Sequence, residues 1–363
     1  MGRPSVVFEA LPVPGGMTAV GIPEYRLPKQ NLQADIDYIL SHGIELRTNA
    51  PVKNIDALST DGYKAVFIAT GAHNGRSIRI EGEDVEGVVD SLVFLRARAL
   101  GSEIPCGKRV AVIGGGNAAV DAARSALRMG AAKVLILYRR TVEEMPAYEE
   151  EIEAALEEGV DIHELVAPKR IIHKHGRVVG IEMMRMRLGD ADESGRRRPV
   201  PVEENGFVLE CDMIIPAIGQ RASVEAAADM LELNSWGGIR ADTVTGLTSK
   251  MGIFAGGDCV SGGATVVKAI GAGQKAAVAI DRMLGGYGAL PANVGTSLRR
   301  PSEEELEKVV PRVQEPMISV EERLGCFAEV LGGLSQKEAC TESGRCLRCD
   351  LERAESLGTH KGS

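Results

Sequence analysis

The sequence predicts an α/β fold in which short parallel strands alternate with helices. Three observations support this prediction. Apolar residues 110–113 lead into a Gly-x-Gly-x-x-Ala pattern and then into a helix of small residues. A second short apolar run, residues 252–255, also ends in glycines, and an acidic residue, Asp258, follows them. The chain holds 43 glycines and only 4% aromatic residues, as expected of a protein with many tight turns between strands and helices.

The glycine pattern has the form of a turn that binds a dinucleotide. Gly114 permits the sharp turn out of the first strand, and Gly116 lets backbone amides approach a pyrophosphate. Ala119 is small enough for the helix to pack on its strand. We expect the pyrophosphate to lie at the N-terminus of that helix, where the amides and the helix dipole favour negative charge. The expected elements are a strand at 110–113, a helix at 117–129 and a strand at 134–138.

Arg139 and Arg140 follow the second strand, where proteins that bind NAD usually carry an acidic residue for the ribose 2′-hydroxyl. Guanidinium groups instead form charge-assisted hydrogen bonds with a 2′-phosphate. The pair therefore favours NADPH over NADH. The alternative is that the two arginines only solvate the end of the strand.

The composition limits the classes of function. The 363 residues carry a formal net charge of −9 at pH 7, which disfavours nucleic acid as a partner. We find no apolar run that is long enough and free of charges to span a membrane. Seven cysteines are scattered through the chain, an odd number that argues against a disulfide framework and for reduced thiols in the cytoplasm.

Residues 6–17 predict part of a second nucleotide site. The strand-like run 6–9 ends in Glu9, whose carboxylate can accept hydrogen bonds from an adenosine ribose. Gly15 and Gly16 then offer a loop that a ligand can approach closely.

Two later strands end in residues suited to the same ligand. A strand expected at 65–69 is followed by Thr70 and Gly71, which bring the backbone close to a cofactor. Asp258 can accept hydrogen bonds from ribityl hydroxyls, and a helix expected at 266–283 begins with amides that can face a phosphate or a flavin carbonyl. Each signal alone is typical of an ordinary turn. Their order around the glycine turn favours a nucleotide site.

Several motifs together resemble a known family. They are Val-Phe-Glu-Ala-Leu-Pro-Val-Pro-Gly-Gly-Met (7–17), Gly-Ile-Pro-Glu-Tyr-Arg-Leu-Pro-Lys (21–29), Ala-Thr-Gly (69–71), Gly-Gly-Gly-Asn-Ala-Ala (114–119), Tyr-Arg-Arg (138–140) with Met-Pro (145–146), Ala-Ile-Gly (217–219), and Gly-Gly-Asp (256–258) with Ala-Thr (264–265). The chain resembles the pyridine-nucleotide-dependent flavoproteins shared by the glutamate synthase small subunit and the N-terminal part of dihydropyrimidine dehydrogenase. The motifs run from about residue 6 to residue 285.

The resemblance implies two Rossmann-like nucleotide-binding domains of the pyridine nucleotide-disulfide oxidoreductase type, in which an FAD domain is interrupted by an inserted NADP domain. The expected domains are residues 1–95 plus 245–287 for FAD, 96–244 for NADP, and 288–363 as a linker and a tail that contains cysteines.

The resemblance, together with the turns above, assigns the candidate cofactor contacts. FAD contacts are expected at Glu9, Gly15, Gly16, Met17, Arg26, Val52, Ala69, Thr70, Gly71, Gly257, Asp258 and Thr265. NADPH contacts are expected at Gly114, Gly115, Gly116, Asn117, Ala118, Arg139, Arg140, Ala217 and Gly219. Arg26 follows a Gly-Ile-Pro turn and could pair with a phosphate; the alternative is a solvated cation in a loop. No side chain is expected to act as a catalytic acid or base, because the protein only has to hold the two cofactors against each other.

One part of the family pattern has no counterpart here. Such proteins carry a strand and a Gly-x-Gly-x-x-Gly turn for the FAD pyrophosphate ahead of the residue that corresponds to Glu9, and the present sequence begins too late to contain them. The FAD domain is therefore expected to lack its first strand. Two explanations stay open: the sequence is a fragment, or a separate polypeptide supplies the piece.

Cys340, Cys346 and Cys349 in the tail are candidate metal ligands. Thiolates in a Cys-x-x-Cys arrangement can bind iron or zinc, and Cys326 or Cys340 could complete the four ligands of a 4Fe–4S cluster. The second cysteine-rich stretch of the family is absent. The alternatives are a partial site completed by a partner protein, or free thiols in a disordered tail.

Two groups of charged residues are expected to face solvent. The glutamates between residues 143 and 158 fit the polar face of a helix, and the arginines at 196–198 fit the tip of a hairpin.

The sequence thus predicts an NADPH-dependent flavoprotein oxidoreductase. It would pass electrons from NADPH through FAD to an iron–sulfur or partner-subunit acceptor, by analogy with the glutamate synthase small subunit. The alternative is a non-catalytic or regulatory nucleotide-binding subunit whose FAD half stays empty and whose tail cysteines mediate assembly.

Overall fold

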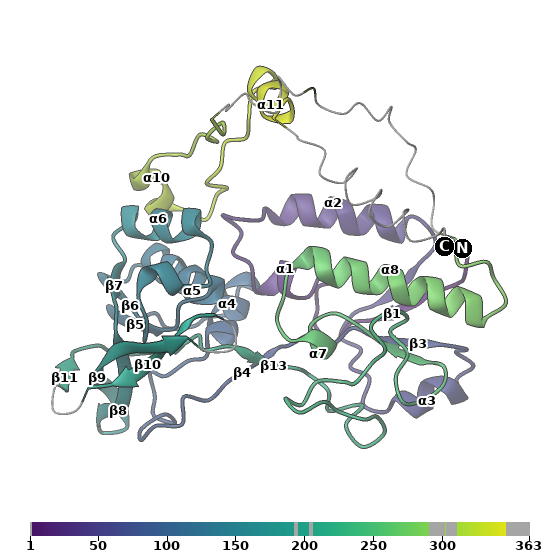
Figure 1. Cartoon of the computed structure of the whole chain (residues 1–363), viewed down its shortest axis with the longest axis horizontal. Helices are drawn as coiled ribbons and strands as arrows, with labels where there is room; N and C mark the ends of the chain where they lie inside the picture. Colours follow the sequence, from purple (N-terminus) through teal and green to yellow (C-terminus); the bar gives the residue numbers. More distant parts are fainter. Residues whose placement is uncertain (1, 192–194, 203–205, 290–301, 303–310, 346–363) are drawn as a thin grey trace. The chain divides into compact units, whose positions relative to one another are not determined.

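The computed structural model describes residues 2–191, 195–202, 206–289, 302 and 311–345 (Figure 1). The chain divides into two compact units, Met1–Gly288 with Val320–Glu329, and Ala289–Ser319 with Val330–Ser363. We call the first of these the main unit; it contains all the expected nucleotide contacts. No helix among the described residues has the length and apolar character needed to cross a membrane.

The glycine turn follows an inner strand of a four-stranded parallel sheet. Its order is β12 (Met213–Pro216), β5 (Arg109–Ile113), β6 (Lys133–Leu137) and β7 (Asp161–His163). Ile113 pairs with both Leu137 and Pro216, so β5, β6 and β12 end at one edge of the sheet. The chain moves from β5 to β6 in one direction and later adds β12 on the other side of β5. Ligands of such sheets bind at the carboxyl ends of the strands, where the order reverses.

Helices pack on one face of this sheet and an antiparallel sheet packs on the other. Successive side chains of β5 point alternately to the two faces. Val110 and Val112 pack with helices on one face, while Ala111 and Ile113 pack with an antiparallel sheet on the other. The helices are α4 (Ser91–Ala99), α5 (Asn117–Arg128) and α6 (Glu149–Glu157). The antiparallel strands are β8 (Val166–Lys174), β9 (Arg177–Ala191), β10 (Arg197–Pro201) and β11 (Phe207–Leu209).

The rest of the main unit holds two parallel strand pairs. The first is β1 (Val6–Phe8) with β2 (Glu45–Arg47), and the second is β3 (Val66–Ile68) with β14 (Ile253–Ala255). No strand pairing joins the two pairs within the described residues. The helices of this part are α1 (Met17–Val20), α2 (Lys29–Leu40), α3 (Ile55–Thr60), α7 (Asp258–Ser261) and α8 (Val266–Met283).

The chain crosses between these two parts at an antiparallel ribbon of β4 (Asn74–Gly75) and β13 (Gln220–Arg221). Phe94 of α4 is buried in the core of the parallel sheet, and Leu231 is buried in the core around β14. Single side chains on either side of residues 95 and 244 thus pack in both cores, and the domain boundaries themselves stay a prediction. We call residues 76–219 the central region, and residues 2–73 with 222–288 the flanking region.

Candidate nucleotide-binding site

The three glycines of the turn after β5 differ in their surroundings. Gly114 has φ 147°, and a Cβ there would lie 2.3 Å from the carbonyl oxygen of Ala217. A Cβ on Gly115 would lie 2.5 Å from the ring of Tyr138. At Gly116 the nearest atom to a Cβ would be 3.9 Å away, on Pro146. Packing thus requires the first two glycines, whereas the third leaves open space beside the backbone.

The amides that follow the turn are available to a ligand. Within the described part of the chain, the N–H groups of Gly115, Gly116, Asn117 and Ala118 donate to no backbone carbonyl. The side-chain oxygen of Asn117 accepts a hydrogen bond from the amide of Tyr148 at 3.0 Å, which fixes the side chain beside the turn. Free amides at the positive end of the 12-residue helix α5 are the groups that bind a phosphate. The geometry fits the pyrophosphate of NADPH.

Arg139 and Arg140, after β6, have different environments. Arg139 is exposed, whereas Arg140 is 5% exposed and its Nε donates to the carbonyl oxygen of Arg197 at 2.7 Å. Arg197 begins β10, and its guanidinium pairs with Glu144 at 2.9 Å. Residues 196–198 lie where β9 and β10 form an antiparallel hairpin, and Arg197 is its first paired residue on β10, opposite Ala191.

Ala217 and Gly219 lie where β12 ends, next to the glycine turn. The amide of Ala217 donates to the carbonyl of Ile113 at 2.8 Å, and Gly219 has φ 109°. The structure therefore brings together all the residues expected to contact NADPH: the glycine turn, the end of β6 and the end of β12.

Part of the expected FAD set is also brought together. Because β3 and β14 are parallel and in register, Ala69, Thr70 and Gly71 lie beside the turn that contains Gly257 and Asp258. Asp258 accepts a hydrogen bond from the amide of Ala264 at 3.2 Å, and burial raises the pKa of its carboxyl. The hydroxyl of Thr265 caps α8 by accepting from the amide of Lys268.

A second part of the FAD set lies after β1. Glu9 accepts a hydrogen bond from the amide of Leu11 at 2.8 Å. Gly15 and Gly16 have φ 108° and 55°, and nothing lies within 4 Å of a Cβ built on Gly16. Met17 begins α1, and Val52 is partly buried.

The fit of these residues to FAD is partial. No strand pairing within the described residues connects the β1 pair with the β3–β14 pair, and no second Gly-x-Gly-x-x-Gly turn opens a helix there. Carboxylate and glycine positions suited to a ribose and a flavin are present. The 18-residue helix α8, which Thr265 caps, offers a helix N-terminus, but no Gly-x-Gly-x-x-Gly turn precedes it.

Arg26 occupies an environment that the sequence did not predict. Its guanidinium donates to both carboxylate oxygens of Asp121 in α5 at 2.9 Å, and it pairs with Glu151 of α6 at 2.8 Å. Its side chain is 20% exposed, so it is not a solvated loop cation. A contact between Arg26 and FAD stays a prediction.

The expected solvent-facing glutamates include one that is buried. Glu158 is 3% exposed and accepts hydrogen bonds from Arg124 at 2.7 Å and Arg128 at 2.6 Å. The prediction for this residue was wrong because two arginines on α5 provide partners that outweigh the cost of burial. The spacing of Asp121, Arg124 and Arg128 on an alanine-rich helix was the available signal, since residues three and four apart share one face.

The tail cysteines lie largely outside the described residues. Cys346 and Cys349 are not described, and Cys340 is an exposed free thiol in α11 (Gln336–Ser343). Among the residues that the structure describes, no three histidine, cysteine or acidic side chains are grouped so that they could hold a metal ion. The proposed cluster is therefore not tested.

A family model for pyridine nucleotide-disulphide oxidoreductases matches residues 7–273. The chain is 43% identical to the NADP(+)-dependent formate dehydrogenase subunit beta of Moorella thermoacetica, over 96% of this chain and 51% of that protein. It is 37% identical to the NADPH-Fe(3+) oxidoreductase subunit beta of Geobacter sulfurreducens, over 96% of this chain and 58% of that protein. The glutamate synthase [NADPH] small chain of Escherichia coli is 37% identical over 76% of this chain and 62% of its own length. The chain thus spans about half of the first two relatives.

Solved structures agree with the fold. Mycobacterium tuberculosis FprA in complex with NADPH matches with a TM-score of 0.66 over 78% of each chain, at 18% identity. The thioredoxin reductase of T. acidophilum matches with a TM-score of 0.59 over 78% of this chain and 91% of that chain, at 19% identity.

Proposed function

Because the chain belongs to the pyridine nucleotide-disulphide oxidoreductase family, we propose that it oxidises NADPH through FAD and passes the electrons to an iron–sulfur or partner-subunit acceptor. The observation that carries this proposal is the set of four free amides at the start of α5, with an exposed arginine at the end of the neighbouring strand. An enzyme that uses NADPH needs both: amides for the pyrophosphate and a cation for the 2′-phosphate.

The proposed roles follow from the surroundings of each residue. Gly116, Asn117 and Ala118 bind the NADPH pyrophosphate, and Arg139 contacts the 2′-phosphate. Arg140 fixes the end of β6 to β10, because its Nε donates to the carbonyl of Arg197. A bound flavin supplies the chemistry, since it accepts two electrons from a nicotinamide and can release them singly. The protein orients the two rings and excludes water from them.

We place the NADP domain in the central region and the FAD domain in the flanking region. The residues after β1, β3 and β14 would contact FAD. Among the described residues, β1 and β3 each pair with a strand on one side only, and α8 exposes apolar side chains at Val267 and Ile270. We propose that a further polypeptide segment, in this protein or in a partner, covers this surface and supplies the missing pyrophosphate contacts.

The partner is proposed from the relatives. Two are named as beta subunits and one as a small chain, which supports a partner subunit as the electron acceptor here. Cys340, Cys346 and Cys349 are the proposed ligands of an iron–sulfur cluster on the way to that acceptor. Cys106, Cys211 and Cys259 are free thiols, which supports a reducing, cytoplasmic location.

A visible absorption spectrum of the purified protein tests the proposal. We expect flavin absorption that is bleached by NADPH, and bleached more slowly by NADH. The double variant Arg139→Ala, Arg140→Ala should weaken the binding of NADPH about tenfold or more and leave the binding of NADH nearly unchanged. Equal loss for both nucleotides would contradict the 2′-phosphate assignment. A colourless protein that still binds NADPH would favour the regulatory alternative, in which the FAD half stays empty.

A further inference from the structure

A buried ion-pair network joins the flanking region to the central region. Arg26 lies in the flanking region, in the loop of residues 21–28. It donates to both oxygens of Asp121 and pairs with Glu151, so one guanidinium bridges α5 and α6. The carboxylate of Asp121 is 6% exposed. These are contacts between residues about a hundred positions apart in the chain, and they cross the boundary between the two regions.

The neighbouring residue, Tyr25, extends the network. Its side chain is 1% exposed, and its hydroxyl donates to the backbone carbonyl of Asp121 at 3.4 Å. The guanidiniums of Arg124 and Arg128 lie 4.8 and 4.1 Å from the centre of its ring. Cations held against an aromatic face are attracted to it, and burial strengthens the attraction. The loop is therefore attached to α5 by charge pairs on one side and by an aromatic ring on the other.

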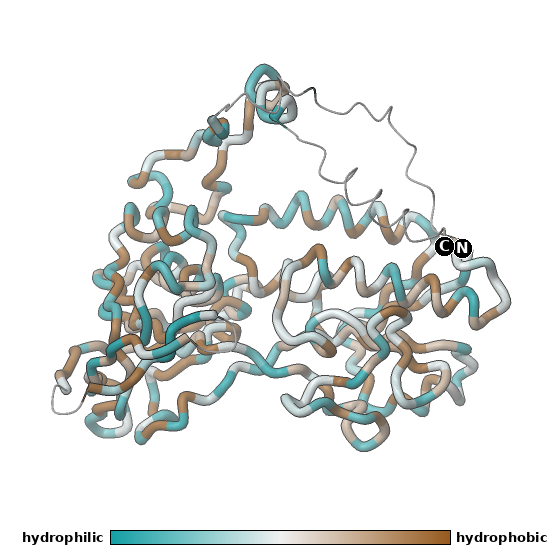
Figure 2. The backbone as a smooth tube through the Cα atoms, in the orientation of Figure 1, coloured by the Kyte–Doolittle hydropathy of each residue, from teal (hydrophilic) through white to brown (hydrophobic). Residues whose placement is uncertain are grey.

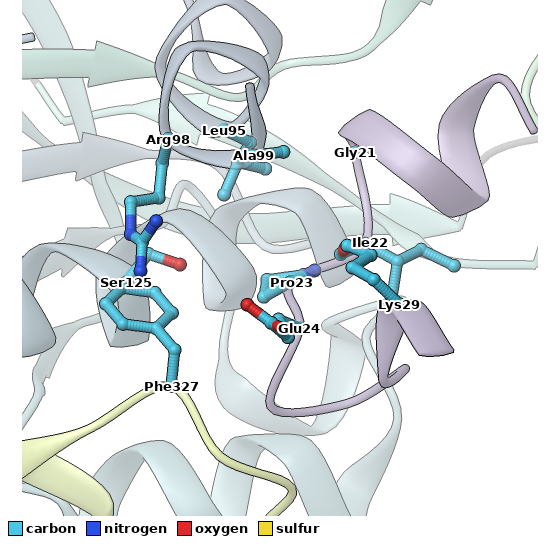
Figure 3. A pocket seen from close by; sticks show the side chains of 10 residues that line it. All are labelled: Gly21, Ile22, Pro23, Glu24, Lys29, Leu95, Arg98, Ala99, Ser125 and Phe327. Carbon is cyan, nitrogen blue, oxygen red and sulfur yellow. The ribbon is translucent and has the colours of Figure 1, made fainter. Parts of the chain in front are cut away.

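A segment from much later in the chain closes over the same junction. Phe327 follows α10 (Val320–Gly325), and its ring centre lies 6.1 Å from that of Tyr25. The guanidinium of Arg98 in α4 lies 4.0 Å from the centre of the Phe327 ring. Figure 3 shows Phe327 and Arg98 on one side of a pocket whose other side is formed by the loop. Arg323, whose side chain is 6% exposed, pairs with Glu157 of α6 at 2.8 Å.

Buried charges make this junction selective for one arrangement. Removing one partner of a buried ion pair leaves an uncompensated charge, so a rotation that separates Arg26 from Asp121 would be strongly unfavourable. The helix held in this way is α5, whose first turn carries the free amides of the proposed NADPH site. Whatever fixes α5 against the loop therefore also fixes the bound nucleotide relative to the flanking region.

We propose that Tyr25, Arg26, Asp121, Glu151 and Phe327 form a junction clamp that sets the position of the nicotinamide relative to the flavin. Asp121 and Phe327 are then positioning residues for electron transfer, acting through α5 and the loop. This inference rests on the proposed function. It adds to that function a device that holds the two nucleotide-binding regions in one orientation.

Asp121→Asn and Phe327→Ala test the clamp in the full-length protein. Each should slow the reduction of bound flavin by NADPH about tenfold or more, because small displacements of reacting groups are costly. The dissociation constant of NADPH should change by less than about threefold, since neither residue touches the nucleotide. Amide hydrogen exchange in residues 21–28 and 117–128 should become faster in both variants. The double variant should be less impaired than the product of the two single effects, because the residues share one network.

The matched control is Arg3→Met. The Arg3–Asp281 pair has the same 2.9 Å length, but both residues lie in the flanking region. This variant should keep the wild-type reduction rate and the wild-type exchange in residues 21–28 and 117–128.

Three results would overturn the clamp. The first is a wild-type rate of flavin reduction in both variants, and the second is unchanged amide hydrogen exchange in residues 21–28 and 117–128. The third is a loss of activity that is explained entirely by weaker binding of NADPH. If Asp121→Asn does not fold, Phe327→Ala decides the question, because Phe327 is only partly buried. A wild-type protein without reducible flavin would refute the proposed function, and the exchange experiment would still test the clamp.

Discussion

Gly115 and Gly116 are adjacent, yet they are glycine for different reasons. A Cβ on Gly115 would overlap the ring of Tyr138, which is 6% exposed and held by a hydrogen bond from its hydroxyl to the carbonyl of Glu144. Gly116 has no such neighbour, and its φ of −93° is accessible to any residue. Packing explains the first glycine, and the proposed ligand explains the second.

This contrast gives a prediction at a single pair of residues. Gly115→Ala should lower the free energy of unfolding by about 1–3 kcal/mol, because the core around Tyr138 cannot absorb the added methyl. Gly116→Ala should leave the free energy of unfolding close to that of the wild type. It should weaken the binding of NADPH about tenfold or more, because the methyl group occupies the space of the pyrophosphate. Urea unfolding and fluorescence titration with NADPH measure the two effects. Tight NADPH binding by Gly116→Ala would contradict the assigned position of the phosphate.

At the level of helices, α5 and α6 are joined by charges that the sequence alone places on the surface. Burial raises the pKa of Glu158, but hydrogen bonds and charges from Arg128 and Arg124 outweigh it, and the pKa lies below its ordinary value. A carboxyl with a depressed pKa adds stability that is present above its unfolded pKa and is lost as the pH falls through the folded value. The pair of helices should therefore loosen in acid.

Glu158→Gln tests this element-level prediction. At pH 7 the variant should be about 3 kcal/mol less stable, because two guanidiniums lose their buried partner. The difference from wild type should shrink as the pH falls below about 4.5, where the unfolded carboxyl is protonated. Urea unfolding between pH 3 and pH 7 is the measurement. The wild type has to be compared with the variant, because the pH dependence of its stability also contains the contribution of Asp121. Burial raises the pKa of the Asp121 carboxyl to about 6, although Arg26 lowers it, so Asp121 contributes in the opposite sense.

The matched control for that experiment is Glu232→Gln. Glu232 pairs with Arg240 at 3.0 Å, but both side chains are exposed. Exposed pairs contribute little, so its effect should be small at every pH. A pH dependence of Glu158→Gln that resembles this control would show that Glu158 is not charged in the folded state.

At the scale of the whole molecule, α8 is a long helix of the flanking region that leaves apolar side chains uncovered. Hydrophobic and hydrophilic residues are interspersed along it (Figure 2), and Val267 and Ile270 are 77% and 57% exposed. Ala276, on the opposite face, is 1% exposed. The helix thus has a buried face and an uncovered apolar face, and β1 pairs with a strand on one side only within the described residues.

We therefore expect the isolated chain to self-associate, because uncovered apolar faces and open strand edges favour contacts between copies. The double variant Val267→Lys, Ile270→Lys should shift the protein toward the monomer and change the unfolding free energy little. Sedimentation velocity and urea unfolding measure the two effects. Ala276→Lys serves as the contrast, since it should unfold the helix. Unchanged association in the double variant would mean that another surface is responsible.

Local signals predicted much of the central region. The expected strands at 110–113 and 134–138 are confirmed within one residue at each end, and the helix at 117–129 is confirmed as α5. The expected helix at 266–283 has the bounds of α8. These elements follow from short-range causes: the period of apolar residues, glycines that permit a turn, and a threonine that caps a helix.

The sequence by itself determined the family, the parallel sheet and the glycine turn, because each depends on residues close together in the chain. Only the tertiary structure decided that Arg140 is buried against β10 while Arg139 is exposed, that Glu158 is a partner of Arg124 and Arg128, and that Arg26 reaches α5. A charged side chain is stable in the interior only if opposite charges surround it. Whether those charges arrive depends on how distant segments pack, which no local pattern records.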